Sequence, residues 1–227
     1  MAARFRDRFE AGRVLASLLK HRAHDPDCIV LALPRGGVPV GYEVARALQA
    51  PLDVFIVRKL GLRGHPEFAI GAIGSGGVRV LNSEAVRALN VSDAEIEDTA
   101  RQEQEELERR EVIFRGTRPP VDVHGRNVIL VDDGLATGST MRAAVVALRQ
   151  KHPRSITVAV PVSATDSCHE FRADVDEIIC ARTPEPFIAV GLWYDDFTQT
   201  TDEEVRELLE EAAGFASAER AHAHGAP

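Results

Sequence analysis

The 227-residue chain has few aromatic residues, few cysteines and no long hydrophobic run. Aromatics make up 5% of it, and Cys28, Cys168 and Cys180 are an odd number of cysteines in apolar or strand-like surroundings. We therefore expect buried, reduced thiols in a cytoplasmic protein. Because there is neither a signal peptide nor an apolar run of membrane-spanning length, we expect no membrane partner.

An excess of basic charge is also missing, since the formal net charge is −8 at pH 7. This balance argues against a nucleic-acid partner held by bulk electrostatics. No Cys/His spacing indicates zinc, and the chain has neither a Walker P-loop nor a dinucleotide-binding glycine fingerprint. A content of 44% hydrophobic and 27% charged residues is ordinary for a globular protein, and we expect a single domain over 1–227.

The most informative stretch is Val128–Thr140, which reads VILVDDGLATGST. Four consecutive aliphatic residues predict a buried parallel strand that ends at Asp132 and Asp133, and Met141–Arg149 predicts a helix. Free N–H groups at a helix N-terminus favour phosphate, and carboxylates accept hydrogen bonds from ribose hydroxyls. The stretch therefore predicts a sugar-phosphate site. The phosphate would lie against Thr137, Gly138, Ser139 and Thr140.

All thirteen positions resemble the phosphoribosyl-pyrophosphate (PRPP) signature of type I phosphoribosyltransferases. The resemblance implies that Asp132 and Asp133 contact the ribose hydroxyls and that the loop, including Ala136, binds the 5′-phosphate. It implies PRPP and a nucleobase or other nitrogen nucleophile as substrates. It also implies Mg²⁺ as the cofactor, bound by PRPP near Asp132 and Asp133. The implied reaction transfers ribose 5-phosphate to the base and releases pyrophosphate.

Two further loops are rich in anion-binding groups. The predicted first strand, Cys28–Leu33, ends in Pro34-Arg35-Gly36-Gly37 before a helix over Val38–Ala50. A guanidinium and close-approach glycines at a helix start suit an anion, and the resemblance assigns pyrophosphate to this loop. A second strand is predicted over Leu52–Val57, with Arg58 and Lys59 at its exit. Two cations there suit a diphosphate, although a solvated charge pair is the alternative.

The alternation of strands and helices predicts the fold class. Further strands are expected at 155–162 and 175–180, with helices near 4–20, 166–171 and 205–213, the last capped by residues 201–204. Such a pattern favours an α/β fold with a doubly wound, mainly parallel sheet. Loops at the carboxyl ends of its strands would converge on one crevice, which is independent support for a shared site.

Three segments are expected outside that sheet. The glycine-rich segment at about 61–81 looks like a flexible lid, part of which could form a hairpin. A small C-terminal hood at about 183–200 gathers aromatics, among them Trp193, which either packs in a core or stacks on a base. The helix over 92–110 is polar nearly all round, so it covers one side of the domain or reaches a homodimer partner. Residues 214–227 read as a disordered tail.

Two other functions stay open, and the acceptor base is undetermined. The same crevice could serve a non-catalytic regulatory protein that senses PRPP or a nucleotide, or a phosphohydrolase. In 6-oxopurine phosphoribosyltransferases the residue at position 136 is usually Asp, whereas Ala at that place resembles the adenine enzymes. We therefore expect hypoxanthine and guanine to be poor substrates. Any general base would come from the lid or hood, with Glu67, Asp195 and Asp196 as candidates.

Overall fold

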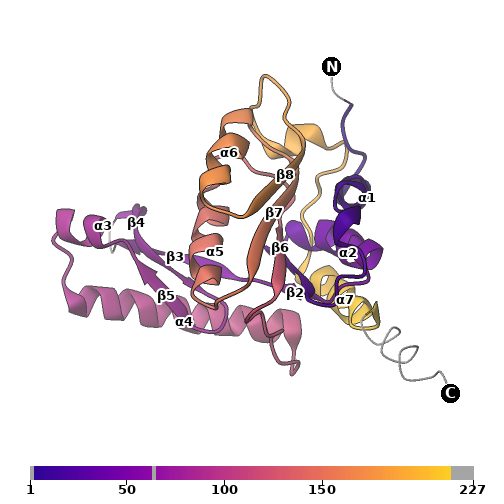
Figure 1. The fold of residues 1–227 in the computed structure, drawn as a ribbon. Helices are drawn as coiled ribbons and strands as arrows, with labels where there is room; N and C mark the ends of the chain where they lie inside the picture. The colour runs from indigo at the N-terminus through magenta and orange to yellow at the C-terminus, as the bar shows by residue number, and fades with distance from the viewer. Residues whose placement is uncertain (1–2, 63–64, 216–227) are drawn as a thin grey trace.

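A computed structural model describes residues 3–62 and 65–215 and contains a central, fully parallel sheet of five strands (Figure 1). The strand order is β2-β1-β6-β7-β8. The chain therefore runs outward from β1 to β2 on one side, and from β6 through β7 to β8 on the other. This confirms the predicted doubly wound α/β fold. The strands are β1 (Cys28–Ala32), β2 (Leu52–Val54), β6 (Asn127–Val131), β7 (Ser155–Val162) and β8 (Glu177–Arg182).

Helices cover both faces of this sheet. Alternate strand residues Val30 and Ile129 pack on one side with the first helices, whereas Ile29 and Val128 pack on the other. Because both faces are buried, the strands read as continuous apolar runs. The first face is covered by α1 (Arg8–Leu18), α2 (Gly37–Leu48) and α7 (Asp202–Ala212), and the second by α5 (Ser139–Arg149) and α6 (Thr165–Glu170) (Figure 1).

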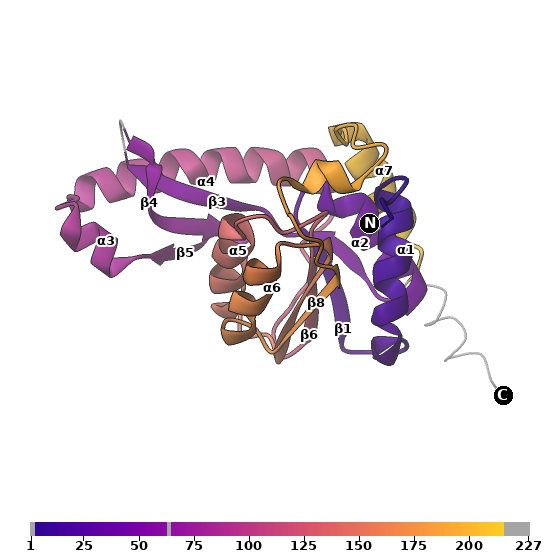
Figure 2. The ribbon, with the colours of Figure 1, turned by 90° about the horizontal axis from the view of Figure 1, so that it is seen from above.

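An arm extends away from the central sheet (Figure 2). It is a three-stranded antiparallel sheet of β3 (Val57–Leu62), β4 (His65–Gly74) and β5 (Val78–Leu81), followed by α3 (Ser83–Ala88) and α4 (Asp93–Arg115). The hairpin expected within part of 61–81 is present and takes up most of that segment, since β4 alone spans His65–Gly74. Gly71 permits this strand pairing, because a Cβ there would stand 2.3 Å from Val80 O.

The end of the second strand was also predicted wrongly. The parallel strand β2 ends at Val54, and Phe55 and Ile56 are buried between it and β3. Arg58 and Lys59 lie within β3, where they pair with Ile73 and Ala72 of β4. The sequence pattern does not mark this boundary, because the apolar run continues from β2 through Phe55 and Ile56 into β3.

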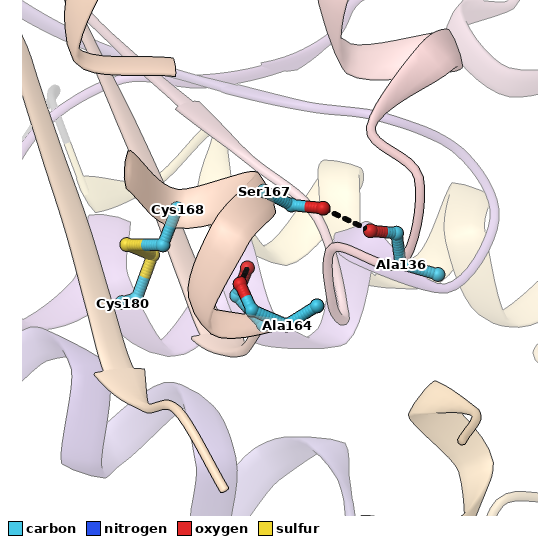
Figure 3. Close-up of a disulfide and its surroundings, with 6 residues drawn as sticks. Ala136, Ala164, Ser167, Cys168 and Cys180 are labelled. Atoms are coloured by element: carbon cyan, nitrogen blue, oxygen red, sulfur yellow. Dashed lines mark hydrogen bonds between the residues drawn. A yellow bond between two sulfur atoms is a disulfide. The ribbon is translucent and has the colours of Figure 1, made fainter. Parts of the chain in front are cut away.

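Cys168 and Cys180 form a disulfide that joins α6 to β8 (Figure 3). The expectation that all three cysteines are reduced thiols was wrong for these two, since pairing across the sheet edge cannot be read from spacing. Cys28 is a buried free thiol, and burial raises its pKa to about 11.

The segment before α1 pairs with the hood segment beside the crevice. Phe5 N–H donates to Trp193 O at 2.8 Å, and Asp195 N–H donates back to Phe5 O at 2.8 Å. Phe5, Ala11, Val162 and Tyr194 form a small core beneath this pairing. Short 3₁₀ turns complete the chain: η1 (Lys20–Arg22), η2 (Phe171–Ala173) and η3 (Val190–Trp193).

Helix boundaries near the arm and the C-terminus follow their capping residues. Ser92 with Glu95 and Thr201 with Glu204 form two capping boxes, which begin α4 and α7. None of the helices described is both long and apolar enough to span a membrane. Of the predicted tail, residues 216–227 lie outside the described part of the chain.

Candidate functional site

Asp132 and Asp133 stand where β6 leaves the sheet. Asp132 Oδ1 accepts the Asp133 N–H at 2.9 Å, and Asp133 Oδ2 accepts Arg8 Nε at 2.9 Å. Among the described residues, nothing donates to the second oxygen of either carboxylate. Burial and the neighbouring Asp133 charge raise the pKa of Asp132 well above its usual range. Burial also raises the pKa of Asp133, although Arg8 opposes that shift.

The loop after β1 comes up beside this pair. A Cβ atom at Gly37 would stand 2.8 Å from Val131 O, so only glycine lets the two loops approach this closely. The Gly37 N–H donates to Leu33 O at 3.0 Å, whereas the Gly36 N–H meets no acceptor in the part of the chain described. The Arg35 guanidinium lies 3.5 Å from Asp202 of α7. The Pro34–Arg35 peptide is cis.

The phosphate loop, residues 134–138, leads into α5. Within the described residues, the N–H groups of residues 136–141 donate to no protein acceptor, and the first helical bond runs from Arg142 N–H to Gly138 O at 2.8 Å. Gly138 takes a left-handed conformation (φ 70°) that places these groups around one point. Thr137, Ser139 and Thr140 are exposed there. Unpaired amides at a helix N-terminus suit an anion, and the predicted phosphate site falls on these groups.

Helix α6 supports that loop from behind (Figure 3). Ser167 Oγ donates to Ala136 O at 2.5 Å, and Ala164 N–H donates to Leu135 O at 3.1 Å. The Cys168–Cys180 disulfide fixes the same helix to β8. The phosphate loop is thus held by a cross-linked element.

Arg58 and Lys59 point in opposite directions, since they are neighbours in a strand. Lys59 Nζ donates to Ser139 Oγ at 2.9 Å, which places this cation at the phosphate loop rather than beside Arg35. Arg58 forms an ion pair with Glu103 of α4. The structure therefore brings Lys59 to the site but places Arg58 against the arm helix.

A cavity of about 490 Å³ adjoins Asp133 and the Pro34–Gly36 turn. Four arginines line it: Arg8, Arg35, Arg109 and Arg110. The last two belong to α4 and also pair with Glu106. The sequence interpretation missed Arg8 and treated α4 as a solvated helix. A charged residue on the apolar face of the first helix, in register with Phe5 and Leu15, is the signal that could have identified Arg8.

The hood aromatics are largely packed into the protein. Tyr194 is buried and donates from its hydroxyl to Asp133 O at 2.6 Å, and burial raises its pKa. Trp193 is half-buried against the small core around Phe5. The Phe197 ring lies between Gly191 and the guanidinium of Arg8, which is 4.0 Å from the ring centroid.

The acidic pair suits a magnesium ion that arrives with its substrate. Residues 3–62 and 65–215 contain no group of three His, Cys, Asp or Glu side chains able to hold a metal alone. Two carboxylates with open oxygens match the way Mg²⁺ is bound through one or two carboxylates together with substrate phosphates. The donor set therefore fits an ion held mainly by a diphosphate.

Comparison with known proteins agrees with this geometry. TT1426 of Thermus thermophilus, a solved structure, superposes with a TM-score of 0.82 at 44% identity, over 92% of this chain and 98% of its own. MT0597 and Rv0571c of Mycobacterium tuberculosis, provisionally named phosphoribosyl transferases, are each 46% identical over 208 residues, or 92% of this chain. The chain spans about half the length (47%) of both.

A shorter match and a family model complete the comparison. The Bifunctional protein PyrR of Halalkalibacterium halodurans is 53% identical over 51 residues, 22% of this chain and 28% of its own. The model described as Phosphoribosyl transferase domain matches residues 8–195, which include both loops of the crevice and its acidic pair. The chain therefore belongs to the type I phosphoribosyltransferase family.

Proposed function

We propose that this chain transfers ribose 5-phosphate from PRPP to a nitrogen of an acceptor base and releases pyrophosphate. The observation that carries the proposal is the convergence of three features on one crevice. The phosphate loop offers unpaired N–H groups, Asp132 and Asp133 each offer an open oxygen, and an arginine-lined cavity adjoins them. These features match, in order, the 5′-phosphate, the ribose hydroxyls and the diphosphate of PRPP.

The reaction breaks the bond between ribose C1 and the diphosphate oxygen and forms a bond from C1 to the acceptor nitrogen, which loses its proton. Negative charge grows on the leaving diphosphate, and Arg35 and the Gly36 N–H, which line the cavity, would stabilise that charge. The positive charge that builds on the ribose ring faces Asp132 and Asp133. Magnesium carried by the diphosphate, and held by these two carboxylates, would neutralise further charge on the leaving group.

Lys59 contributes to a different part of this scheme than the sequence indicated. Its contact with Ser139 places it where the 5′-phosphate would bind, so it anchors the ribose phosphate instead of the leaving group. Holding the phosphate and the hydroxyls at two separate points fixes C1 between the loops. This positioning lowers the entropic part of the barrier.

Pyrophosphate release provides the test. The protein is incubated with PRPP, Mg²⁺ and a panel of purine and pyrimidine bases, with the Asp132→Asn/Asp133→Asn double variant as the control. We expect base-dependent pyrophosphate release by the wild type and loss of it in the variant. Release of inorganic phosphate independent of a base would instead indicate a phosphohydrolase, and PRPP binding without any release would indicate a sensor.

A further inference from the structure

Arg8 is a buried charged residue that lines the cavity and contacts the acidic pair, and the proposed reaction gives it no step of its own. It is the first residue of α1 and only 9% exposed. Its Nε and Nη2 both lie 2.9 Å from Asp133 Oδ2. Removing a guanidinium from water is costly, so its burial at the acidic pair calls for a specific role.

The other side of the same guanidinium is fixed by the C-terminal segment. Nη1 donates to Thr198 O at 2.7 Å, and the group lies 4.0 Å from the centroid of the Phe197 ring. The backbone before Arg8 is fixed as well, because Asp196 N–H donates to Arg6 O at 2.9 Å. Arg8 is therefore held in one orientation by contacts that do not involve Asp133.

This arrangement determines how Asp133 is presented. Arg8 binds Oδ2 alone, which leaves Oδ1 without a protein donor among the described residues, and Asp133 lines the cavity. Without Arg8, Asp133 would carry its charge next to Asp132 with no compensating cation in contact. The carboxylate would then rotate or move away from its neighbour.

We propose that Arg8 is a positioning residue that acts through Asp133, holding Oδ2 so that Oδ1 faces the ribose hydroxyls of the bound substrate. The inference rests on the proposed function, because it assigns the ribose to Asp133. It also links ribose recognition to the contact between α1 and the hood segment, since Thr198 and Phe197 fix the guanidinium.

Arg8→Gln and Arg8→Lys test this role by calorimetry with two probes, PRPP with Mg²⁺ and ribose 5-phosphate, which lacks the diphosphate. A charge-assisted hydrogen bond is worth roughly a 10- to 100-fold change in affinity. We expect Arg8→Gln to weaken both probes by that factor and Arg8→Lys to recover part of it. Arg13→Gln in the same helix is the control, because Arg13 pairs with Glu43 on α2 and should leave both affinities unchanged.

Three outcomes would overturn the inference. A loss of PRPP affinity without a loss of ribose 5-phosphate affinity would mean that Arg8 contacts the diphosphate directly. If Arg8 acts through Asp133, adding Arg8→Gln to the Asp133→Asn variant should lower the affinity for either probe by less than about twofold, because the effects of coupled residues are not additive. A full additional loss there, or unchanged affinity in folded Arg8→Gln, contradicts action through Asp133. If the wild type binds neither probe, the proposed function itself fails.

Discussion

Gly36 and Asp133 lie so close together that a Cβ atom at Gly36 would stand 2.1 Å from Oδ2 of Asp133. Gly36 itself has right-handed backbone angles (φ −60°, ψ −32°) that any residue adopts without strain. The glycine is therefore required by the neighbouring carboxylate and not by its own conformation. This contact joins the loop after β1 to the acidic pair.

Gly36→Ala should abolish the fit between these two loops. The added methyl group must displace Asp133 or the loop, so we expect PRPP affinity to fall about tenfold or more while the chain stays folded. Gly12→Ala is a matched control, since its Cβ would meet Glu43 Cβ at 2.8 Å, away from the crevice. That variant should lose stability but keep PRPP affinity. Wild-type affinity in Gly36→Ala would contradict the assigned crevice.

Asp132→Asn should stabilise the metal-free protein at neutral pH. Burial raises the pKa of Asp132, so the folded chain binds a proton more readily than the unfolded chain does. The free energy of unfolding should therefore fall as pH rises from about 4 through the raised pKa. Asparagine carries no charge and removes that loss, so the free energy of unfolding at pH 7 should be about 0.5–2 kcal/mol higher in Asp132→Asn than in the wild type. Urea unfolding of both proteins across pH measures the difference. A less stable variant at pH 7 would contradict this prediction.

Asp53→Asn serves as the contrasting control. Asp53 is also buried, but Arg115 Nε lies 2.8 Å from its Oδ1. Removing this charge leaves the buried Arg115 guanidinium with Glu111 as its remaining ion-pair partner, so we expect a loss of about 1.5–3 kcal/mol in the same experiment. Opposite signs for the two Asp→Asn changes would separate a carboxylate kept for binding from one kept for stability.

The two halves of the crevice should be separable by ligand. Arg35→Gln and Arg110→Gln remove cations from the cavity next to the Pro34–Gly36 turn, so each should weaken pyrophosphate and PRPP while sparing a nucleoside 5′-monophosphate. Thr137→Val and Lys59→Ala act at the phosphate loop and should weaken the monophosphate as well. We expect losses of about tenfold in calorimetric affinity.

Arg101→Gln is the control for the helix arginine. Arg101 lies on α4 with Arg110 and forms an i,i+3 pair with Asp98, but it does not line the cavity. Its removal should leave every affinity unchanged. If both groups of variants weakened the monophosphate equally, the division into a diphosphate half and a phosphate half would be wrong.

The sheet could be predicted from the sequence because burial on both faces leaves a direct pattern. The predicted strands at Cys28–Leu33, Val128–Val131 and Ser155–Val162 match β1, β6 and β7 to within one residue. The glycine-rich arm could not be predicted this way. The longest of its strands, β4, has only Ile70 and Ile73 as β-branched residues, and Gly71 is there because the Val80 backbone passes close by.

The site could be predicted only in part, because sequence patterns identify loops but not which distant elements meet them. Asp132, Asp133 and the Thr137–Thr140 loop adjoin one strand, so their proximity follows from the chain order. Arg8 reaches Asp133 across 125 positions, and Arg110 reaches the cavity through the packing of α4. Lys59 lies at the phosphate loop and not beside the Pro34–Gly36 turn, because the strand that carries it belongs to the second sheet.

Reduction of the Cys168–Cys180 disulfide should lower stability. A cross-link between residues 12 apart removes conformational freedom from the unfolded chain, which is worth about 2–3 kcal/mol. Urea unfolding with and without dithiothreitol should show that difference in the wild type. The Cys168→Ser/Cys180→Ser variant should start at the lower stability and not respond to the reductant. A wild type that does not respond would mean that the disulfide does not stabilise the fold.

The identity of the acceptor base is tested at Ala136. Its methyl group is exposed and can neither accept a proton nor hydrogen-bond, while its carbonyl accepts Ser167 Oγ at 2.5 Å. Of the candidate bases, Asp196 is poorly suited, because hydrogen bonds from the Thr198 hydroxyl and N–H lower its pKa. The Glu67 side chain lies outside the described residues, and Asp195 is exposed.

Hypoxanthine and guanine should therefore be poor acceptors for the wild type. A general base contributes about 10²–10⁴-fold, so we expect their turnover to lie at least 100-fold below that of the best base in a panel of purines and pyrimidines. Ala136→Asp should raise oxopurine turnover relative to the wild type. Ala136→Asn introduces a side chain of the same shape as Asp that accepts no proton, so this variant should not raise oxopurine turnover. Efficient hypoxanthine or guanine transfer by the wild type would refute the argument, since no carboxylate stands at position 136 to receive the proton.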